Sequence, residues 1–146
     1  MSSPTQQIIP MLAYEDGIAA MNWLCEVFGF KEVTRMTDDN GRLSHGEIAM
    51  GDSIVMLAEP TPDYQGPAHH AQNCAIAAKW YGVPYVINGV LVYVDDVKQH
   101  YEHAKNGGAT ILSELGEGFP ETRYRAADLE GQRWMFMQEG RDEIKK

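Results

Sequence analysis

The sequence predicts an α+β fold in which two paired β-α-β-β-β modules form a curved-sheet cup, with the helices outside. Residues 123–138 alternate apolar and polar side chains on both sides of a turn at Glu130-Gly131, which is typical of a β-hairpin. Residues 45–59 repeat this pattern, with Met56 in the place that Met135 takes in the later hairpin. A helical pattern between an aspartate and a glycine precedes each hairpin, so the chain reads as two copies of one unit.

Module one is expected over about residues 7–59. Its expected elements are a strand, a helix, a strand and a hairpin, over residues 7–14, 17–28, 30–37 and 45–59. Pro10 cannot donate a hydrogen bond to a neighbouring strand, so the first strand should lie at a sheet edge or begin late. Asp16 should cap the helix, and Gly29 should end it. The turn of the hairpin is expected at Gly51-Asp52.

A helical linker over residues 60–86 is expected to join module one to module two within a single domain that spans residues 1–146. The alanine-rich residues 68–81 predict one helix in this linker. Either Asp95 or Asp96 should cap the helix of module two. The expected elements of module two are a strand, a helix, a strand, a flexible loop and a hairpin, over residues 87–94, 97–106, 109–113, 114–121 and 123–138, followed by a charged tail over residues 139–146.

The composition is that of an ordinary globular protein, with 44% hydrophobic and 23% charged residues among 146. A formal net charge of -9 argues against nucleic acid or an anionic membrane as a partner, and it favours a cationic small molecule weakly. Two cysteines do not make a disulfide framework. The N-terminal residues have neither a basic nor an apolar leader region, and no apolar run is long enough for a membrane span, so a cytoplasmic location is expected.

The order of several motifs resembles the glyoxalase/bleomycin-resistance/extradiol-dioxygenase superfamily, also called vicinal oxygen chelate (VOC). These motifs are VFGF after the first helix, then HGEIAMGDSIVML, YVDDVKQHYEHAKNGGATIL and DLEGQRWMF. The resemblance covers residues from about Ile8 to Gln138. It implies paired modules that form a cup, and in metal-dependent members a divalent cation held by four His, Gln or Glu side chains. It also implies, for the metal-free branch related to bleomycin resistance proteins, antibiotic resistance by sequestration in homodimers whose ligand grooves lie at or near the subunit boundary.

The four metal-ligand positions implied by the resemblance fall at Ile9, Met56, Gly89 and Met135. None of these residues supplies the oxygen or imidazole donor that a hard or borderline divalent cation requires, and a thioether is a poor substitute. We therefore expect no metal at the family's site and no other cofactor.

Strand alternation around Met56 and Met135 predicts which side chains face the cup. The expected ligand-binding residues are Met11, Met56, Leu91, Tyr93, Tyr124, Met135 and Met137. Such an apolar, methionine-rich surface with a few polar groups is the usual composition of a small-molecule site. The alternative is that these side chains simply fill a core, because apolar alternation is chiefly a packing signal.

His45 and Glu47 are the candidate catalytic pair. Two residues apart on a strand, they share a face, and a carboxylate beside an imidazole raises its basicity enough for general-base chemistry. The same pair also suits a structural ion pair at a sheet edge or a contact with a dimer partner. His100 and His103 lie at helical spacing and are interpreted as surface residues.

The function that the sequence favours is metal-independent binding of a small molecule by a homodimer. The acidic net charge is compatible with a cationic ligand. One rival is a VOC-fold enzyme of lyase, isomerase or dioxygenase type that uses His45 and Glu47 or a metal at atypical positions. A third reading is a structural or partner-binding module whose cup is filled by its own side chains.

Overall fold

The computed structural model describes residues 6–83, 85, 87–116 and 122–139, so most of the predicted charged tail and part of the loop at 114–121 lie outside the described residues. Its elements in chain order are β1 (Met11–Ala13), α1 (Gly17–Phe28), β2 (Lys31–Thr37), β3 (Leu43–Met50), β4 (Ser53–Ala58), α2 (Pro67–Asn73), α3 (Ala75–Tyr81), β5 (Gly89–Tyr93), α4 (Val97–Asn106), β6 (Thr110–Ser113), β7 (Arg123–Ala127) and β8 (Arg133–Met137).

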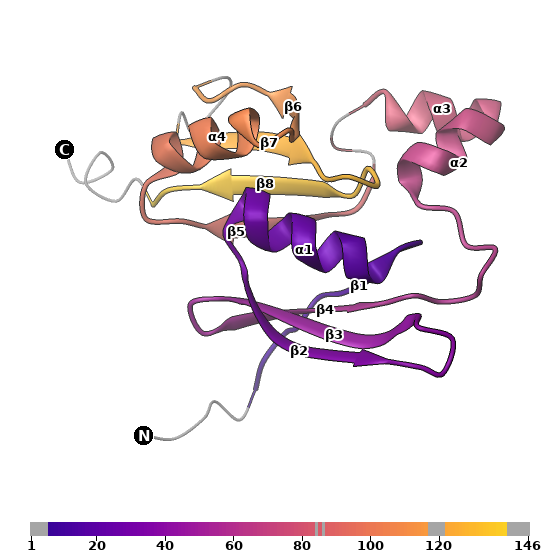
Figure 1. Cartoon of the computed structure of the whole chain (residues 1–146). Coiled ribbons are helices and arrows are strands. Elements are labelled where there is room, and N and C mark those ends of the chain that lie inside the picture. The colour runs from indigo at the N-terminus through magenta and orange to yellow at the C-terminus, as the bar shows by residue number, and fades with distance from the viewer. Residues whose placement is uncertain (1–5, 84, 86, 117–121, 140–146) are drawn as a thin grey trace.

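The strands form two four-stranded sheets, in the orders β1-β4-β3-β2 and β5-β8-β7-β6 (Figure 1). In each sheet the first strand runs parallel to the last, and the remaining pairs are antiparallel. The prediction of an α+β fold built from two β-α-β-β-β modules is therefore confirmed, although the two sheets do not close on each other. β1 begins after Pro10 and forms an edge strand, as the missing N–H of proline requires.

Helix α1 has the predicted bounds because both of its ends are encoded locally. The Asp16 carboxylate accepts a hydrogen bond from the backbone N–H of Ala19, and Gly29 ends the helix at a φ of 84°. Figure 1 shows α1 between the two sheets. Its Met21 lies against Gly46 of β3 so closely that a Cβ there would approach the sulfur to 2.6 Å, while Phe28 packs on the second sheet.

Aromatic rings join α1 to module two. Phe28 packs edge-on against Trp134 and Phe136 of β8, with ring centroids 5.7 and 4.7 Å away. Phe30, which follows the helix, lies 5.5 Å from Trp134. The Trp134 indole N–H and the Tyr14 hydroxyl both donate to the buried Asp128 carboxylate. A single core therefore runs from one sheet through α1 to the other.

The last strand of each module also caps the helix of that module. The Glu59 carboxylate, just beyond β4, accepts the N–H of Gly17 at the start of α1. The Gln138 side-chain carbonyl, just beyond β8, accepts the N–H of Val97 at the start of α4. Each contact satisfies a backbone donor that the first turn of a helix leaves without a partner.

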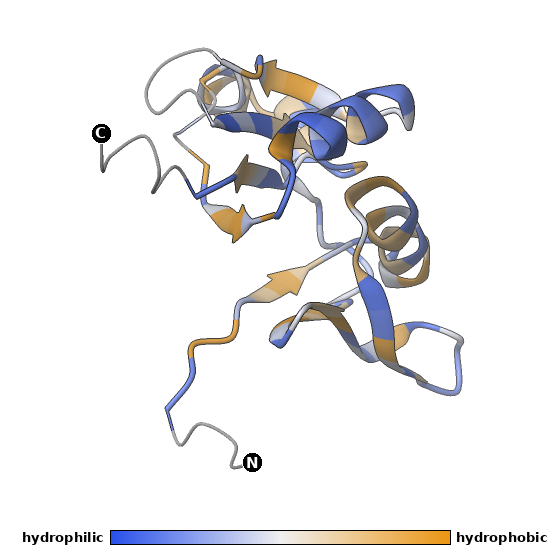
Figure 2. Ribbon diagram, turned by 90° about the vertical axis from the view of Figure 1, so that its left-hand side faces the viewer, coloured by the Kyte–Doolittle hydropathy of each residue, from blue (hydrophilic) through white to orange (hydrophobic). Residues whose placement is uncertain are grey.

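The two module helices differ in their surroundings. Figure 2 shows α4 as largely hydrophilic, and only Val97 and Ala104 of this helix are buried. Helix α1 buries Ala20, Met21 and Leu24 among others, because both of its sides are covered by protein. No helix in the described part of the chain is long and apolar enough to span a bilayer.

The linker differs from the prediction of one helix over residues 68–81. It forms α2 and α3, which are separated by Cys74 in an extended conformation with a φ of -145°. The guanidinium of Arg133 on β8 donates to the carbonyls of Tyr81 and Val83 and stacks on the Tyr81 ring at 4.8 Å. The linker is thereby attached to the second sheet at the end of α3.

Candidate functional site

Each sheet has one face covered by helices and one face without a helical cover, which we call the open face. On the first sheet, Met11, Met56 and Glu47 lie side by side in one row across β1, β4 and β3. The Met11 side chain is 78% exposed. His45 lies two residues before Glu47, and its Nε2 is 2.7 Å from the Glu47 Oε2. The predicted contact between these two side chains is thus present, and their catalytic role stays a prediction.

The open face of the second sheet repeats the row with different chemistry. Leu91, Met135, Arg125 and Ser113 lie side by side across β5, β8, β7 and β6. Tyr93 and Met137 form a neighbouring pair on the same face. Leu91 and Tyr93 are 49% and 57% exposed, so large apolar side chains lie on this face without cover.

The two open faces do not meet within one chain. The opposite faces of both sheets pack on α1 or against residues that contact it, so the open faces are directed away from the helix on both sides (Figure 1). Met11 and Met56 are therefore separated by the core from Met135 and Met137. The predicted ligand-binding residues therefore do not line one cup within a single chain, as the sequence suggested, because α1 packs between the two sheets (Figure 1).

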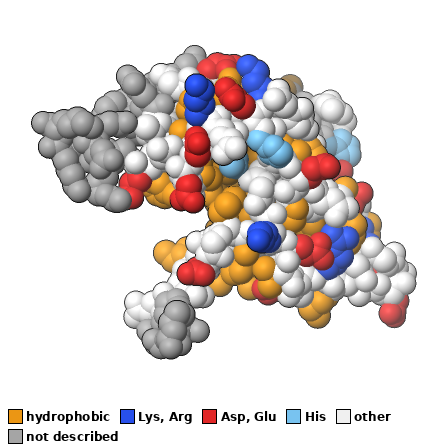
Figure 3. All heavy atoms as spheres, turned by 60° about the vertical axis from the view of Figure 1, so that its left-hand side comes forward, with side chains coloured by type: hydrophobic (Ala, Val, Ile, Leu, Met, Phe, Trp, Pro, Cys, Tyr) orange, Lys and Arg blue, Asp and Glu red, His pale blue; other side chains and the backbone are white. Residues whose placement is uncertain are grey.

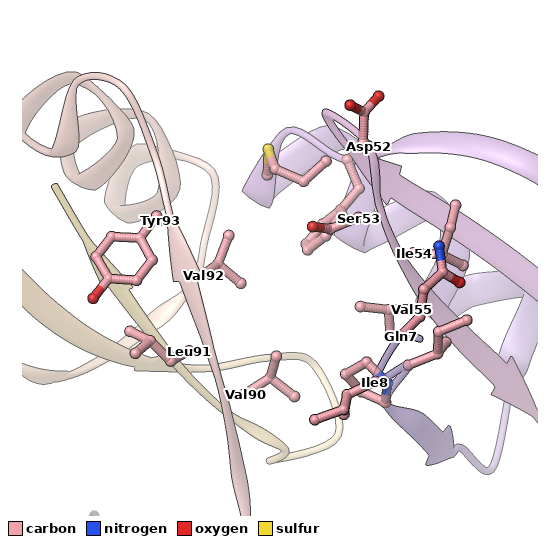
Figure 4. A pocket seen from close by; sticks show the side chains of 14 residues that line it. Gln7, Ile8, Asp52, Ser53, Ile54, Val55, Val90, Leu91, Val92 and Tyr93 are labelled. Atoms are coloured by element: carbon pink, nitrogen blue, oxygen red, sulfur yellow. The ribbon is translucent and has the colours of Figure 1, made fainter. Parts of the chain in front are cut away.

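A hollow of about 510 Å³ lies between the modules, where the edge strand β5 faces β4 and the segment before β1. Figure 3 shows a notch between the two halves of the molecule with hydrophobic side chains along it. In Figure 4, Val90 and Val92 point toward Val55 and the N-terminal segment, while Leu91 and Tyr93 point away. Leu91 and Tyr93 nevertheless also line this inter-module hollow, so at the edge strand β5 it adjoins the open face of the second sheet. A neighbouring hollow of about 480 Å³ is lined in part by α4.

The prediction that Tyr124 faces the cup was wrong. Tyr124 pairs with Phe136 in the ladder and is fully buried on the face that α4 covers. Burial raises the pKa of the Tyr124 phenol. The residue that lies opposite Met135 is Arg125, one position along β7.

His100 also differs from the surface residue that its spacing suggested. Its Nε2 lies 2.8 Å from the Phe28 carbonyl, which can only accept, so Nε2 carries the proton. Its Nδ1 is therefore the acceptor for the Tyr124 hydroxyl at 2.6 Å. Desolvation lowers the pKa of His100, which keeps the imidazole neutral. His103 lies 2.8 Å from the Glu26 carbonyl, so both histidines tie α4 to the end of α1.

The residues at the family's metal positions do not fit a divalent cation. Ile9, Met56, Gly89 and Met135 offer no oxygen or nitrogen from a side chain. Arg125 places a positive charge in the ladder beside Met135. Within residues 6–83, 85, 87–116 and 122–139, no three His, Cys, Asp or Glu side chains gather closely enough to hold a metal ion.

Arg125 and Ser113 are the open-face residues that sequence reasoning missed. Desolvation, together with the nearby Arg123, lowers the pKa of the Arg125 guanidinium. Side chains alternate between the two faces along β7, whose sequence is RYRAA. The open face therefore carries either Arg123 and Arg125 or Tyr124, and the sequence of the strand does not decide which. The signal that decides between them is the length of the following turn, which fixes the register.

Known proteins share both the sequence pattern and this architecture. The family model of the Glyoxalase/Bleomycin resistance protein/Dioxygenase superfamily matches residues 9–136. The crystal structure of TioX from Micromonospora sp. ML1 is similar over 92% of this chain and 97% of its own, with 28% identity and a TM-score of 0.64. An uncharacterised Mycobacterium bovis protein, Mb0911c, is 26% identical over 134 residues, which are 91% of this chain and 83% of its own.

A further solved structure shares the fold. TnmS3, described as an antibiotic binding protein from Streptomyces sp. CB03234, covers 93% of this chain and 98% of its own with a TM-score of 0.59. Its identity is 14%, so this likeness concerns the fold alone. The family match, by contrast, extends from the segment before β1 into β8. With both modules matched in sequence and present in the structure, the chain belongs to the glyoxalase/bleomycin resistance protein/dioxygenase superfamily.

Proposed function

We propose that this protein binds a small molecule without a metal ion, on the open faces that carry Met11 and Met56 in one module and Leu91, Tyr93 and Met135 in the other. The observation that carries this proposal is the exposure of large apolar side chains next to the positions where metal-dependent members hold their cation. Met11, Leu91 and Tyr93 are about half exposed or more, although the helix-covered face of each sheet is well packed.

An exposed apolar face of this kind suits an apolar ligand. Each Å² of apolar surface removed from water contributes about 25 cal/mol, so covering Met11, Leu91 and Tyr93 favours binding. Methionine is flexible and polarizable, and it adapts to ligands of irregular shape. Contiguous apolar surface that remains exposed is typical of an interaction site.

We infer further that two copies of the chain complete the site. Because the open faces lie on opposite sides of α1, one chain cannot surround a ligand with both. A second copy can bring its module-two face against the module-one face of the first, and a twofold axis then generates two equal sites. Met56 of one copy and Met135 of the other would line each site.

Two observations support sequestration of a ligand rather than metal-assisted chemistry. The four positions that hold the cation in metal-dependent members carry no oxygen or nitrogen donor from a side chain here, and the superfamily includes bleomycin resistance proteins. The description of TnmS3 as an antibiotic binding protein agrees with a binding role for this fold. A drug-like small molecule is therefore the class of ligand that we propose.

An enzyme that uses His45 and Glu47 is the second candidate, and their contact of 2.7 Å favours it. When Nε2 donates to the Glu47 carboxylate, Nδ1 is free to accept a proton from a substrate. Both side chains are partly exposed on the open face, so a ligand beside Met56 can reach them.

The proposal is tested with the neutral apolar dye N-phenyl-1-naphthylamine, whose fluorescence increases in an apolar site. We expect saturable binding, with stoichiometric metal absent by elemental analysis and no change after dialysis against EDTA. Met135→Lys should weaken binding at least about tenfold, a change of about 1.4 kcal/mol. Val33→Lys is the matched control, because Val33 is 52% exposed on β2 and outside the proposed site.

Two outcomes would contradict this function. If the Met135→Lys and Val33→Lys variants bind the dye with equal affinity, the ligand does not bind on the open face. A stoichiometric metal ion whose removal abolishes binding would end the claim of metal independence. Loss of a measured turnover in His45→Ala, with dye affinity retained, would instead favour the enzyme.

A further inference from the structure

Arg125 occupies an unusual place on the open face of module two. It lies between Met135 of β8 and Ser113 of β6 in the ladder. Met135 is the position of a metal ligand in metal-dependent members, so the guanidinium stands beside the place where those members hold a cation. The neighbouring apolar residue in the same row is Leu91.

Arg125 has no carboxylate partner among the residues that the structure describes. The charged group that affects it most is another arginine, Arg123, and the phenol of Tyr85 is the remaining ionisable neighbour. The Ser113 hydroxyl oxygen is buried and makes no hydrogen bond with the described residues. A guanidinium and a hydroxyl, both able to donate, thus lie next to each other without an acceptor.

Three other arginines of the described chain contact acceptors. Arg35 pairs with Glu32 at 2.8 Å, and Arg42 pairs with Glu59 at 3.3 Å. Arg133 donates to two backbone carbonyls of the linker. In a chain with 21 acidic and 12 basic residues, carboxylates are abundant, and leaving Arg125 without one is a specific feature of this face.

We propose that the small molecule bound on the open faces carries an anionic group, a carboxylate, phosphate or sulfonate, which Arg125 binds beside Met135. This inference rests on the ligand site proposed above and adds the charge of its ligand. The fork of guanidinium N–H groups matches the oxygens of such an anion, and Ser113 is placed to donate a further hydrogen bond. The apolar remainder of the ligand would cover Met135 and Leu91.

This proposal replaces the cationic ligand that the net charge of -9 suggested. Net charge describes the whole surface, whereas a bound ligand experiences the few groups that line its site. In the row across module two these groups are Arg125, Ser113 and the apolar side chains of Met135 and Leu91. The charge in this row of module two is therefore opposite in sign to the net charge of the whole chain.

The test compares two dyes that share one aromatic scaffold. 8-Anilino-1-naphthalenesulfonate carries a sulfonate, and N-phenyl-1-naphthylamine is its neutral counterpart. We expect the chain to bind the sulfonate dye at least about tenfold more tightly than the neutral dye. In Arg125→Met the ratio of the two affinities should fall to about one, and Arg125→Lys should keep part of the preference because it keeps the charge.

Arg35→Met is the matched control, since it removes the same charge from β2 and should preserve the ratio. Thermal melting of each variant verifies that it is folded. Equal affinity of the wild-type chain for both dyes would overturn the anionic ligand and leave the small-molecule site in place. Failure of both dyes to bind would remove the site itself. If Arg125→Met separates a dimer while the affinity ratio persists, Arg125 is a subunit contact and the proposal is wrong.

Discussion

The two modules share one scaffold but present opposite charges on their open faces. Beside Met56 in module one stands Glu47, in contact with His45. Beside Met135 in module two stands Arg125. The hydrogen-bonded ladder positions correspond, so the difference lies in the side chains alone.

This comparison separates what the fold needs from what a ligand needs. The helix-covered faces and the helix caps follow the same plan in both halves, because burial and backbone hydrogen bonding impose it. The open faces do not have to meet these requirements, and they differ in charge. If two copies pair as proposed, each site contains the acidic side chain of Glu47 from one copy and the basic side chain of Arg125 from the other.

The largest expected effect concerns the equivalent core positions Trp134 in module two and Val55 in module one. Trp134 is 1% exposed and packs on Phe28 and Phe30, so Trp134→Ala should lower the free energy of unfolding by about 3–5 kcal/mol. Val55→Ala removes two carbons beside the inter-module hollow and should cost about 1.5 kcal/mol. Urea denaturation of both variants measures the difference. Equal losses would show that the two modules contribute equally to the core.

The next effect compares the two helix caps that follow the last strands. Glu59 accepts the N–H groups of Gly17 and Leu43 and pairs with Arg42, so Glu59→Ala should cost about 2–3 kcal/mol. Gln138 accepts only the N–H of Val97 among the described contacts, so Gln138→Ala should cost about 1 kcal/mol. The measurement is again chemical denaturation. A larger loss of stability in Gln138→Ala than in Glu59→Ala would contradict this prediction.

The two hairpins show how far sequence alone predicts the candidate site. In module one, the turn at Gly51-Asp52 joins Met50 directly to Ser53, so counting along the strands places Glu47 opposite Met56, as observed. In module two, the alternation and the glycine of the turn predicted the strands correctly. Which face each side chain takes, however, depends on the number of residues in the turn.

The number of residues in the turn between β7 and β8 is fixed by Asp128. Its buried carboxylate accepts the N–H groups of Glu130 and Gln132. The loop therefore spans residues 128–132, and Ala127 pairs with Arg133. A turn of two residues at Glu130-Gly131 would give a register shifted by one residue, which reverses every side chain of β7. This shift explains why Tyr124 was predicted on the open face that Arg125 occupies.

Local signals predicted the helices well, and tertiary contacts account for the remaining differences. Caps and apolar stripes fixed the bounds of α1 and α4. The role of His100 depends on the carbonyl of Phe28, which is remote in sequence and near only in the folded chain. No local pattern in a helix of ordinary surface composition indicates such a contact.

The third prediction concerns His100, which ties the helix of module two to that of module one. Because burial lowers its pKa in the folded chain, the unfolded chain binds more protons between the two pKa values. The free energy of unfolding should therefore be highest above about pH 6.5, the pKa of histidine in the unfolded chain, and it should decrease as the pH falls below this value. His100→Gln should flatten this decline and cost about 1–2 kcal/mol at neutral pH through the loss of hydrogen bonds.

Thermal melting between pH 7.5 and pH 5 measures the effect, with His70→Gln as the control. His70 is exposed on α2, so its replacement should leave the pH profile as it is. A wild-type profile that His100→Gln does not alter would show that the imidazole is not the group whose protonation opposes the fold.

The smallest expected effect tests the opposite charges of the open faces directly. In the proposed pairing of copies, Glu47 of one chain shares a site with Arg125 of the other, and its carboxylate repels an anionic ligand. Glu47→Gln should therefore tighten the binding of 8-anilino-1-naphthalenesulfonate by about two- to fivefold, which corresponds to about 0.5–1 kcal/mol for a partly exposed charge. Glu32→Gln on β2 is the control, because Glu32 pairs with Arg35 outside the site. The same affinity in Glu47→Gln and Glu32→Gln would mean that the acidic face of module one and the basic face of module two do not share a ligand.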